Sequence, residues 1–322
     1  MNEINRNFVV TNTPQATQVY HHTLADSERW QKYNPRDGDI VIVTAYKGGT
    51  TWMQAICGAL VFQSAEPPES LDAISPWVEA VFEPIDELVQ RIDALTHRRY
   101  VKTHLPMTAI PYFEQLRYIF VGRDGRDVFM SWWNHWNNIK PEMLQALAER
   151  SDRKGPPMPP PPESINAAFD DWISKSSYPW EKDGYPMWSH HYHAQTWWNY
   201  RHLDNLLFVH FQDLLDDLDG QMRRISAFLD IPINESSWAN LVHSVTFDEM
   251  KKNSDRRAPG ALKDIWKDSK NFFYKGTNRR WESVLKPSQA ERYEALIKDL
   301  MEPNLVRWMV HDEGFLDPKE LR

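Results

Sequence analysis

A short apolar run followed at once by a glycine turn constrains this chain more than any other feature. The run is Ile40-Val-Ile-Val43, and the turn is Thr44-Ala-Tyr-Lys-Gly-Gly-Thr-Thr-Trp52. The β-branched run predicts a buried strand, and the residues after the glycines predict a helix. Glycine lets backbone N–H groups approach an anion, and a helix N-terminus adds its positive dipole. The segment therefore predicts a strand, a phosphate-binding turn and a helix, with Lys47 as a mobile charge.

Further short apolar runs alternate with helical stretches along the chain. Strands are expected at 39–44, Tyr100–Thr103, 118–122 and Leu206–His210. Helices are expected at Thr50–Phe62, from 124 to about 136, at 220–229 and from 287, where Ser288 and Glu291 suit a capping box. This alternation predicts an α/β fold, in which a central parallel β-sheet is flanked by helices on both faces.

The length of 322 residues suits one large domain, and no internal repeat is visible, so we expect a single domain over 1–322. Residues 1–35 are expected to form an irregular or short-helical lead-in. Residues 137–186 are expected to form an insertion and cap, whose proline-rich stretch 155–162 is a surface linker or a docking site for a proline-binding module. Eight tryptophans in and around this region predict a Trp-rich helical cap: Trp132, Trp133, Trp136, Trp172, Trp180, Trp188, Trp197 and Trp198.

Composition excludes several classes of protein. The net charge of −8 argues against a nucleic-acid surface, so any anion site must be a local concentration of basic residues. A single cysteine, Cys57, leaves no disulfide framework and no cysteine-based zinc site. No secretory signal and no membrane span are visible, which predicts a cytoplasmic protein.

The segment Tyr100-Val-Lys-Thr-His-Leu-Pro106 brings a cation and a base together. Lys102 and His104 are two residues apart at a strand end, so both side chains point the same way, toward the edge of a parallel sheet where ligands bind. A histidine near its ordinary pKa can take a proton from a hydroxyl. For a lone histidine, a partly exposed loop position is the alternative.

Two further segments suit anion binding. Arg123 ends the third strand, and Ser131 lies two turns into the next helix; a surface salt bridge between Arg123 and Asp127 is the alternative. Residues 251–280 hold ten Lys or Arg against three Asp, together with aromatics and glycines. This composition suits a flap over an anion, whereas a solvated face is the usual meaning of a charge run.

Together these motifs resemble the cytosolic-type sulfotransferase family, over roughly residues 35–300. The family has Tyr-Pro-Lys-Ser-Gly-Thr-Thr-Trp at the first loop, Lys-Thr-His-Leu-Pro at the second segment and Arg-x-x-x-Asp-x-x-x-Ser at the third. The resemblance implies a P-loop-like sulfotransferase fold. It also implies in-line transfer of a sulfuryl group from 3′-phosphoadenosine 5′-phosphosulfate (PAPS, leaving the product PAP) to a hydroxyl or amine, without a metal.

The resemblance also implies roles for individual residues. Lys47, Gly48, Gly49, Thr50 and Thr51 would hold the 5′-phosphosulfate, and Trp52 would stack on adenine. His104 would be the general base, Lys102 would stabilise charge on the transferring group, and Lys47 would stabilise the leaving phosphate. Arg123 and Ser131 would hold the 3′-phosphate. Three positions match the family's adenine segment and two its flap: Thr246, Phe247, Met250, Lys275 and Gly276. Core packing of Phe247 and Met250 is the alternative.

Several positions depart from the family pattern. Tyr46 replaces a proline, Gly48 a serine and Phe211 a tyrosine that contacts adenine. Tyr274 replaces the flap arginine that grips the 3′-phosphate, and we hypothesise that a nearby arginine compensates: Arg257, Arg279 or Arg280. The family's dimer motif is not recognisable around 282–291, so a homodimer formed by that route is doubtful.

Competing functions stay open at this point. A nucleotide kinase of related fold is disfavoured, because the lysine precedes the glycines and Gly-Lys-Ser/Thr is absent. A non-catalytic binder of 3′,5′-bisphosphonucleotide is disfavoured because Lys47, Lys102 and His104 are all present. The cluster His190, His191 and His193 is expected on a solvated or pocket-lining helix face rather than on a metal. The Trp-rich cap favours a small apolar or aromatic acceptor.

Overall fold

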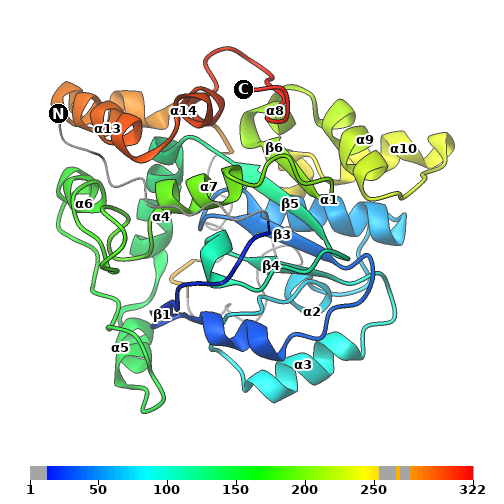
Figure 1. Ribbon diagram of the computed structural model, residues 1–322, viewed down its shortest axis with the longest axis horizontal. Helices are drawn as coiled ribbons and strands as arrows, with labels where there is room; N and C mark the ends of the chain where they lie inside the picture. Colours follow the sequence, from blue (N-terminus) through cyan, green and yellow to red (C-terminus); the bar gives the residue numbers. More distant parts are fainter. Residues whose placement is uncertain (1–12, 254–265, 269–275, 322) are drawn as a thin grey trace.

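A four-stranded parallel sheet forms the centre of the molecule (Figure 1). The computed structural model describes residues 13–253, 266–268 and 276–321. The strand order is β4-β3-β5-β6, with bounds β3 Ile40–Thr44, β4 Tyr100–Thr103, β5 Arg117–Gly122 and β6 Leu206–His210. Residue Ile40 pairs with Tyr100 on one side and with Arg117 on the other. The predicted strands are thus confirmed to within one residue at their ends.

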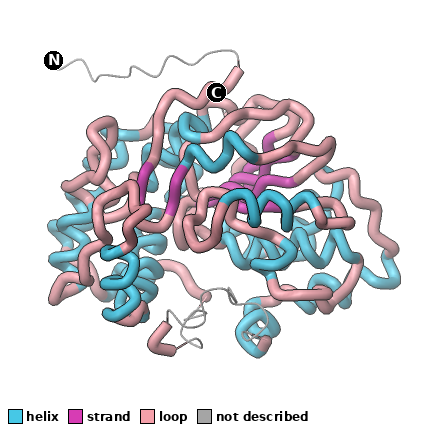
Figure 2. The backbone as a smooth tube through the Cα atoms, turned by 90° about the horizontal axis from the view of Figure 1, so that it is seen from below, coloured by secondary structure: helices cyan, strands magenta, loops and turns pink. Residues whose placement is uncertain are grey.

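The sheet is covered on both faces because its strands carry apolar side chains on both. Val41 and Val43 point into one core and Ile40 and Ile42 into the other. The first core contains α4 Gly125–Asn138, α6 Ile165–Trp172, α7 His190–Trp198, α13 Pro287–Leu300 and α14 Pro303–Val310. The second contains α1 Thr50–Phe62, α9 Leu218–Phe228 and α10 Glu235–Ser244. Figure 2 shows the strands between these helical layers.

The remaining elements are short. They are β1 His21–His22, β2 Ala25–Asp26, η1 Ser27–Lys32, α2 Leu71–Ile74, α3 Ile85–Asp93, η2 Met107–Ala109, α5 Pro141–Glu149, α8 Phe211–Asp216, α11 Phe247–Lys252 and η5 Arg280–Ser283. The lead-in, expected to be irregular or short-helical, contains the antiparallel pair β1–β2 and the short 3₁₀ helix η1 within its described part. No described helix combines the length and the apolar character needed to cross a membrane.

Two helix starts differ from the prediction, and each has a local cause. α9 begins at Leu218 rather than 220, because the Asp217 carboxylate accepts a hydrogen bond from the Gly220 amide at 2.9 Å. Ser288 does not cap α13: the helix begins at Pro287, and the Gln289 side chain accepts from the backbone N–H of Lys286 at 3.1 Å. Proline at the first helical position is the stronger start signal here.

Most of the tryptophans fill the core instead of lining a pocket. Trp172, Trp188, Trp197 and Trp198 are fully buried. The histidine cluster on α7 is buried as well, so the expected solvated or pocket-lining face is wrong. His190 Nε2 donates to the Arg123 carbonyl at 3.1 Å, and the other two rings pack inside the first core. The Trp-rich region is therefore mainly part of the first core, which packs against the sheet, and not a cap that lines the pocket.

Candidate active site

The phosphate-binding turn lies where β3 ends and α1 begins. Lys47 has φ 64° and Gly49 has φ 115°, so the turn passes twice through the left-handed region. A Cβ on Gly49 would lie 2.8 Å from the Phe211 ring, and a Cβ on Gly48 would lie 3.0 Å from the Ala45 carbonyl. Only glycine fits well at position 49. The turn therefore directs the first N–H groups of α1, with Thr50 and Thr51, toward the pocket.

His104 lies at the end of β4, beside the turn. Its Nδ1–H donates to the Thr44 carbonyl at 2.9 Å, which fixes the tautomer and leaves Nε2 as the basic nitrogen. Enclosure by the pocket walls, followed by the charges of Lys102 and Lys47, lowers the pKa of His104 to about 3. The imidazole is therefore neutral at physiological pH, with Nε2 unprotonated.

Glu79 holds the His104 backbone in place and had no signal in the sequence. This fully buried carboxylate accepts from the His104 amide at 2.7 Å and from the Thr103 hydroxyl at 3.0 Å. Trp30 Nε1 donates to its other oxygen at 2.9 Å. Burial raises the pKa of Glu79. A lone acid in a loop gives no periodicity or spacing to read, which is why the residue was missed.

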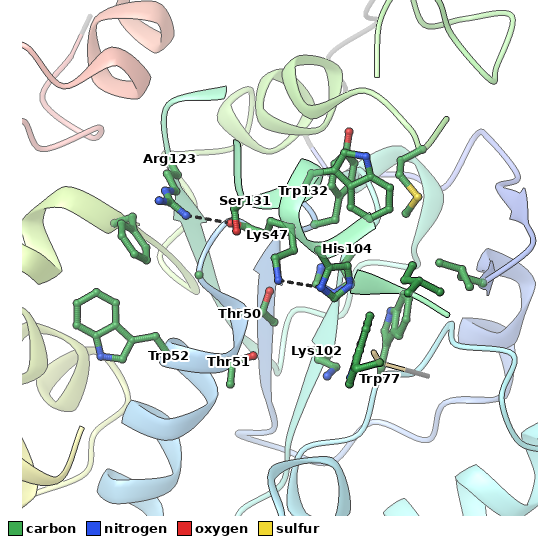
Figure 3. A pocket seen from close by; sticks show the side chains of 18 of the residues that line it. Lys47, Thr50, Thr51, Trp52, Trp77, Lys102, His104, Arg123, Ser131 and Trp132 are labelled. Carbon is green, nitrogen blue, oxygen red and sulfur yellow. Dashed lines mark hydrogen bonds between the residues drawn. The ribbon is translucent and has the colours of Figure 1, made fainter. Parts of the chain in front are cut away.

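The two lysines of the site lie on neighbouring segments, Lys47 in the turn after β3 and Lys102 in β4. Lys102, buried at the end of β4, has its Nζ 3.5 Å from Asp72. Lys47 Nζ lies 3.2 Å from His135 Nδ1, a partner on α4 that the sequence reasoning did not find. Enclosure and the Arg123 guanidinium lower the pKa of Lys47 to about 7. Figure 3 shows Lys47 extending toward His104, whereas the amino group of Lys102 points away from that ring.

Arg123 is not in a surface salt bridge with Asp127. The guanidinium is 7% exposed; it donates to Asn278 Oδ1 at 2.9 Å and to the Lys47 carbonyl at 3.3 Å. It also lies over the Phe211 ring, 4.2 Å from its centroid. Burial lowers the pKa of Arg123 to about 10, which still leaves it charged. Arg123 and Ser131 face the same pocket (Figure 3).

Aromatic side chains lie around Phe211, at the Arg123 end of the pocket. Trp52 Nε1 donates to the Val245 carbonyl at 2.7 Å, and its ring lies 5.2 Å from that of Phe211. Phe247 and Met250 also line the pocket. Thr246 does not; its hydroxyl caps α11 by accepting from the Glu249 amide. Gly276, Thr277 and Arg280 also line the pocket, whereas Gly48 does not. Lys275, Tyr274 and Arg257 fall outside the described residues.

The pocket is a cavity of about 230 Å³ with a polar and an apolar half. The polar half is formed by the residues above. The apolar half is formed by Leu24, Trp77, Phe82, Trp132, Ile139, Leu144, Leu147, Met158, Met187 and Trp266. Of the eight tryptophans of the predicted cap, Trp132 alone is among the pocket-lining residues. An apolar pocket wall is present as expected, but most of its residues are not the tryptophans of the predicted cap.

One group of described side chains has the spacing of a metal site, and it lies outside the pocket. His21, Asp26 and Glu28 have ligand atoms within 4.8 Å of one another. Lys154 Nζ, however, already lies 2.7 Å from Asp26 and 2.8 Å from Glu28. The chemistry of the pocket itself is that of lysine, arginine, hydroxyls and imidazole, which suits an anionic ligand.

Known proteins are similar to this chain in sequence and in fold. Residues 37–304 match the sulfotransferase domain family. The chain is 30% identical over 314 residues to a glycolipid sulfotransferase of Mycobacterium bovis, covering 93% of this chain and 96% of the relative. It is 25% identical to mouse sulfotransferase 1B1, covering 85% and 86%. A solved structure of mouse sulfotransferase SULT7A1 complexed with PAP superposes with a TM-score of 0.66 at 20% identity, covering 92% and 97%.

Proposed function

Because the chain belongs to the sulfotransferase family, we propose that it transfers a sulfuryl group from PAPS to a hydroxyl or amine of an apolar acceptor. The observation that carries the proposal is the convergence of four strand ends on one pocket. β3 leads to Lys47, β4 to His104, β5 to Arg123 and β6 to Phe211. The C-terminal edge of a parallel sheet is where such folds bind ligands.

The residues of the polar half fit a donor with two phosphates. Lys47, Thr50, Thr51 and the N-terminus of α1 suit the 5′-phosphosulfate, since all lie at one turn. Arg123 and Ser131 suit the 3′-phosphate, and Arg280 adds a further cation. Trp52, Phe211, Phe247 and Met250 offer aromatic and apolar surface for adenine. PAP in the solved complex of the mouse relative is consistent with this choice of donor.

The chemistry follows from the placement of His104. Its Nε2 takes the proton of the acceptor hydroxyl as the oxygen attacks sulfur, and the bond from sulfur to the 5′-phosphate oxygen breaks in line. Lys47 stabilises the negative charge on the leaving phosphate, and Lys102 stabilises the charge on the transferring group. A bound anionic donor would offset the positive charges of both lysines. The pKa of His104 would then rise from about 3 toward the pH at which the enzyme works.

The acceptor is expected to carry its reactive group on an apolar body. Ten apolar residues form the apolar half of the pocket wall, and the polar groups near them are those of the reaction. The relatives from Mycobacterium are named glycolipid sulfotransferases, which makes glycolipids one class to try. Phenols, steroids and simple alcohols are the others.

The deciding experiment is incubation of the purified protein with ³⁵S-labelled PAPS and a panel of these acceptors. Transfer of label to a panel member, without added metal, supports the proposal. Intact donor in every incubation would favour the alternative of a non-catalytic binder of 3′,5′-bisphosphonucleotide. Magnesium-dependent transfer from ATP would favour the nucleotide kinase.

A further inference from the structure

Lys47 and His135 form a contact that the proposed reaction does not use. His135 lies in the last turn of α4, four residues after Ser131, so the two side chains share one face of that helix. Its Nδ1 is 3.2 Å from Lys47 Nζ. Lys47 itself lies between Ser131 and His104 in Figure 3, at the junction of the two halves of the pocket. In the proposed function the polar half binds the donor and the apolar half binds the acceptor, and we call them the donor half and the acceptor half. The contact therefore joins Lys47 of the donor half to a histidine whose ring packs on Trp132 and Trp266 of the acceptor half.

The imidazole of His135 is fixed in place and neutral. Its ring lies 4.4 Å from that of Trp266 and 5.9 Å from that of Trp132. Burial, then the charges of Lys47 and His104, holds the pKa of His135 well below its ordinary value. The ammonium form of Lys47 has donors and no acceptor, so when Lys47 is charged it donates and the neutral ring accepts at Nδ1.

We propose that His135 is a positioning residue that competes with the donor nucleotide for the amino group of Lys47. It binds Lys47 in the donor-free enzyme, and it takes Lys47 back when PAP leaves. The inference rests on the proposed function, in which Lys47 contacts the 5′-phosphate. Because Nδ1 offers Lys47 a second partner within the pocket, the contact weakens nucleotide binding and speeds PAP release, a step that limits turnover in many enzymes.

The test is the affinity and dissociation rate of PAP, measured through tryptophan fluorescence, for His135→Leu and His135→Asn. Leucine keeps apolar contact with the two tryptophans but removes the acceptor, whereas the amide oxygen of asparagine can replace Nδ1. We expect His135→Leu to bind PAP about three- to tenfold more tightly, the range of one ordinary hydrogen bond, and to release it more slowly. His135→Asn should stay close to wild type.

A double-mutant cycle with Lys47→Met separates this role from a merely structural one. In the Lys47→Met background, His135→Leu should no longer change PAP affinity. Weaker binding by His135→Leu, or the same change in both backgrounds, would overturn the proposal. If Lys47→Met alone leaves PAP affinity unaltered, the fault lies instead in the proposed function, because Lys47 would then not contact the nucleotide.

Discussion

The two halves of the pocket are built in different ways. The donor half takes its groups from strand ends and first helical turns: Lys47 and Thr50 after β3, Arg123 after β5 and Phe211 after β6. The acceptor half takes its wall from segments far apart in the chain, including the lead-in, α5, the proline-rich loop and Met187, three residues before α7. The donor half is part of the sheet edge, whereas the acceptor half is formed by loops and short elements around that edge.

Because of this difference, we expect the two halves of the pocket to tolerate substitutions differently. A change at the sheet edge moves a strand or a helix N-terminus, because Arg123 hydrogen-bonds the Lys47 carbonyl and packs on Phe211. A change at Leu147 or Met158 alters a wall formed by loops and one short helix. We therefore expect changes at Leu147 or Met158 to leave the donor half undisturbed.

The largest effect is expected at the residue that lies between the halves. His104→Ala should lower kcat by about 10²–10⁴-fold, because it removes the general base. PAP affinity should stay within about twofold of wild type, since the phosphate-binding groups are unchanged. Turnover with the best acceptor of the panel and a PAP titration measure the two quantities. Loss of PAP binding in this variant would show that His104 belongs to the donor half, and that the base is another group.

The donor half was predictable from sequence because its signals are local. Ile40-Val-Ile-Val43 and the glycines after it fix a strand and a turn within ten residues, and Arg123 with Ser131 repeats that pattern after β5. The parallel sheet then brings these loops to one edge. His135 could have been found by the same reasoning, since it lies one helical turn beyond Ser131.

The acceptor half and its supports were not predictable in the same way. Leu24 and Met187 look like any other apolar residues, and only tertiary packing decides which of them face a cavity. Tryptophan content was a poor guide for the same reason, since Trp172 and Trp197 fill the core. Glu79 acts by accepting a hydrogen bond from the backbone N–H of His104, 25 positions away, which no short pattern encodes.

The second prediction concerns pH and tests whether Lys47 serves the donor half. Its pKa is about 7 in the free protein, and a bound 5′-phosphate favours the ammonium form, which raises that pKa. PAP affinity is then greatest below pH 7 and falls as pH rises through 7, by up to about tenfold per unit until the pKa of the complex is reached. Arg123, with a pKa of about 10, stays charged throughout.

Titrations with PAP between pH 7 and 9 measure this slope, in a range where the phosphate itself no longer titrates. Lys47→Met should bind PAP more weakly at pH 7 and show a flat profile. A wild-type profile that is also flat would place the ammonium of Lys47 away from the nucleotide.

The third prediction asks which arginine extends the donor half. Arg280 is half-buried and lines the pocket, whereas Arg279 is exposed and lies 3.0 Å from Asp312. We expect Arg280→Ala to weaken PAP binding about fivefold, the effect of one partly screened charge, and Arg279→Ala to leave it unchanged. The same titration compares the two neighbours directly. Equal effects would mean that only the overall charge of this segment matters.

The smallest effect is expected at the mouth of the acceptor half. Phe82 lines the pocket and is 36% exposed, so its removal costs little core packing. Phe82→Ala should raise the KM of the best acceptor about two- to fivefold through lost apolar contact, with the PAP dissociation constant unchanged. Phe315, which is 52% exposed and is not among the pocket-lining residues, is the matched control, and Phe315→Ala should alter neither constant. A change in PAP affinity with Phe82→Ala would mean that the two halves are not independent. The same rise in KM for both variants would instead place acceptor binding outside this pocket.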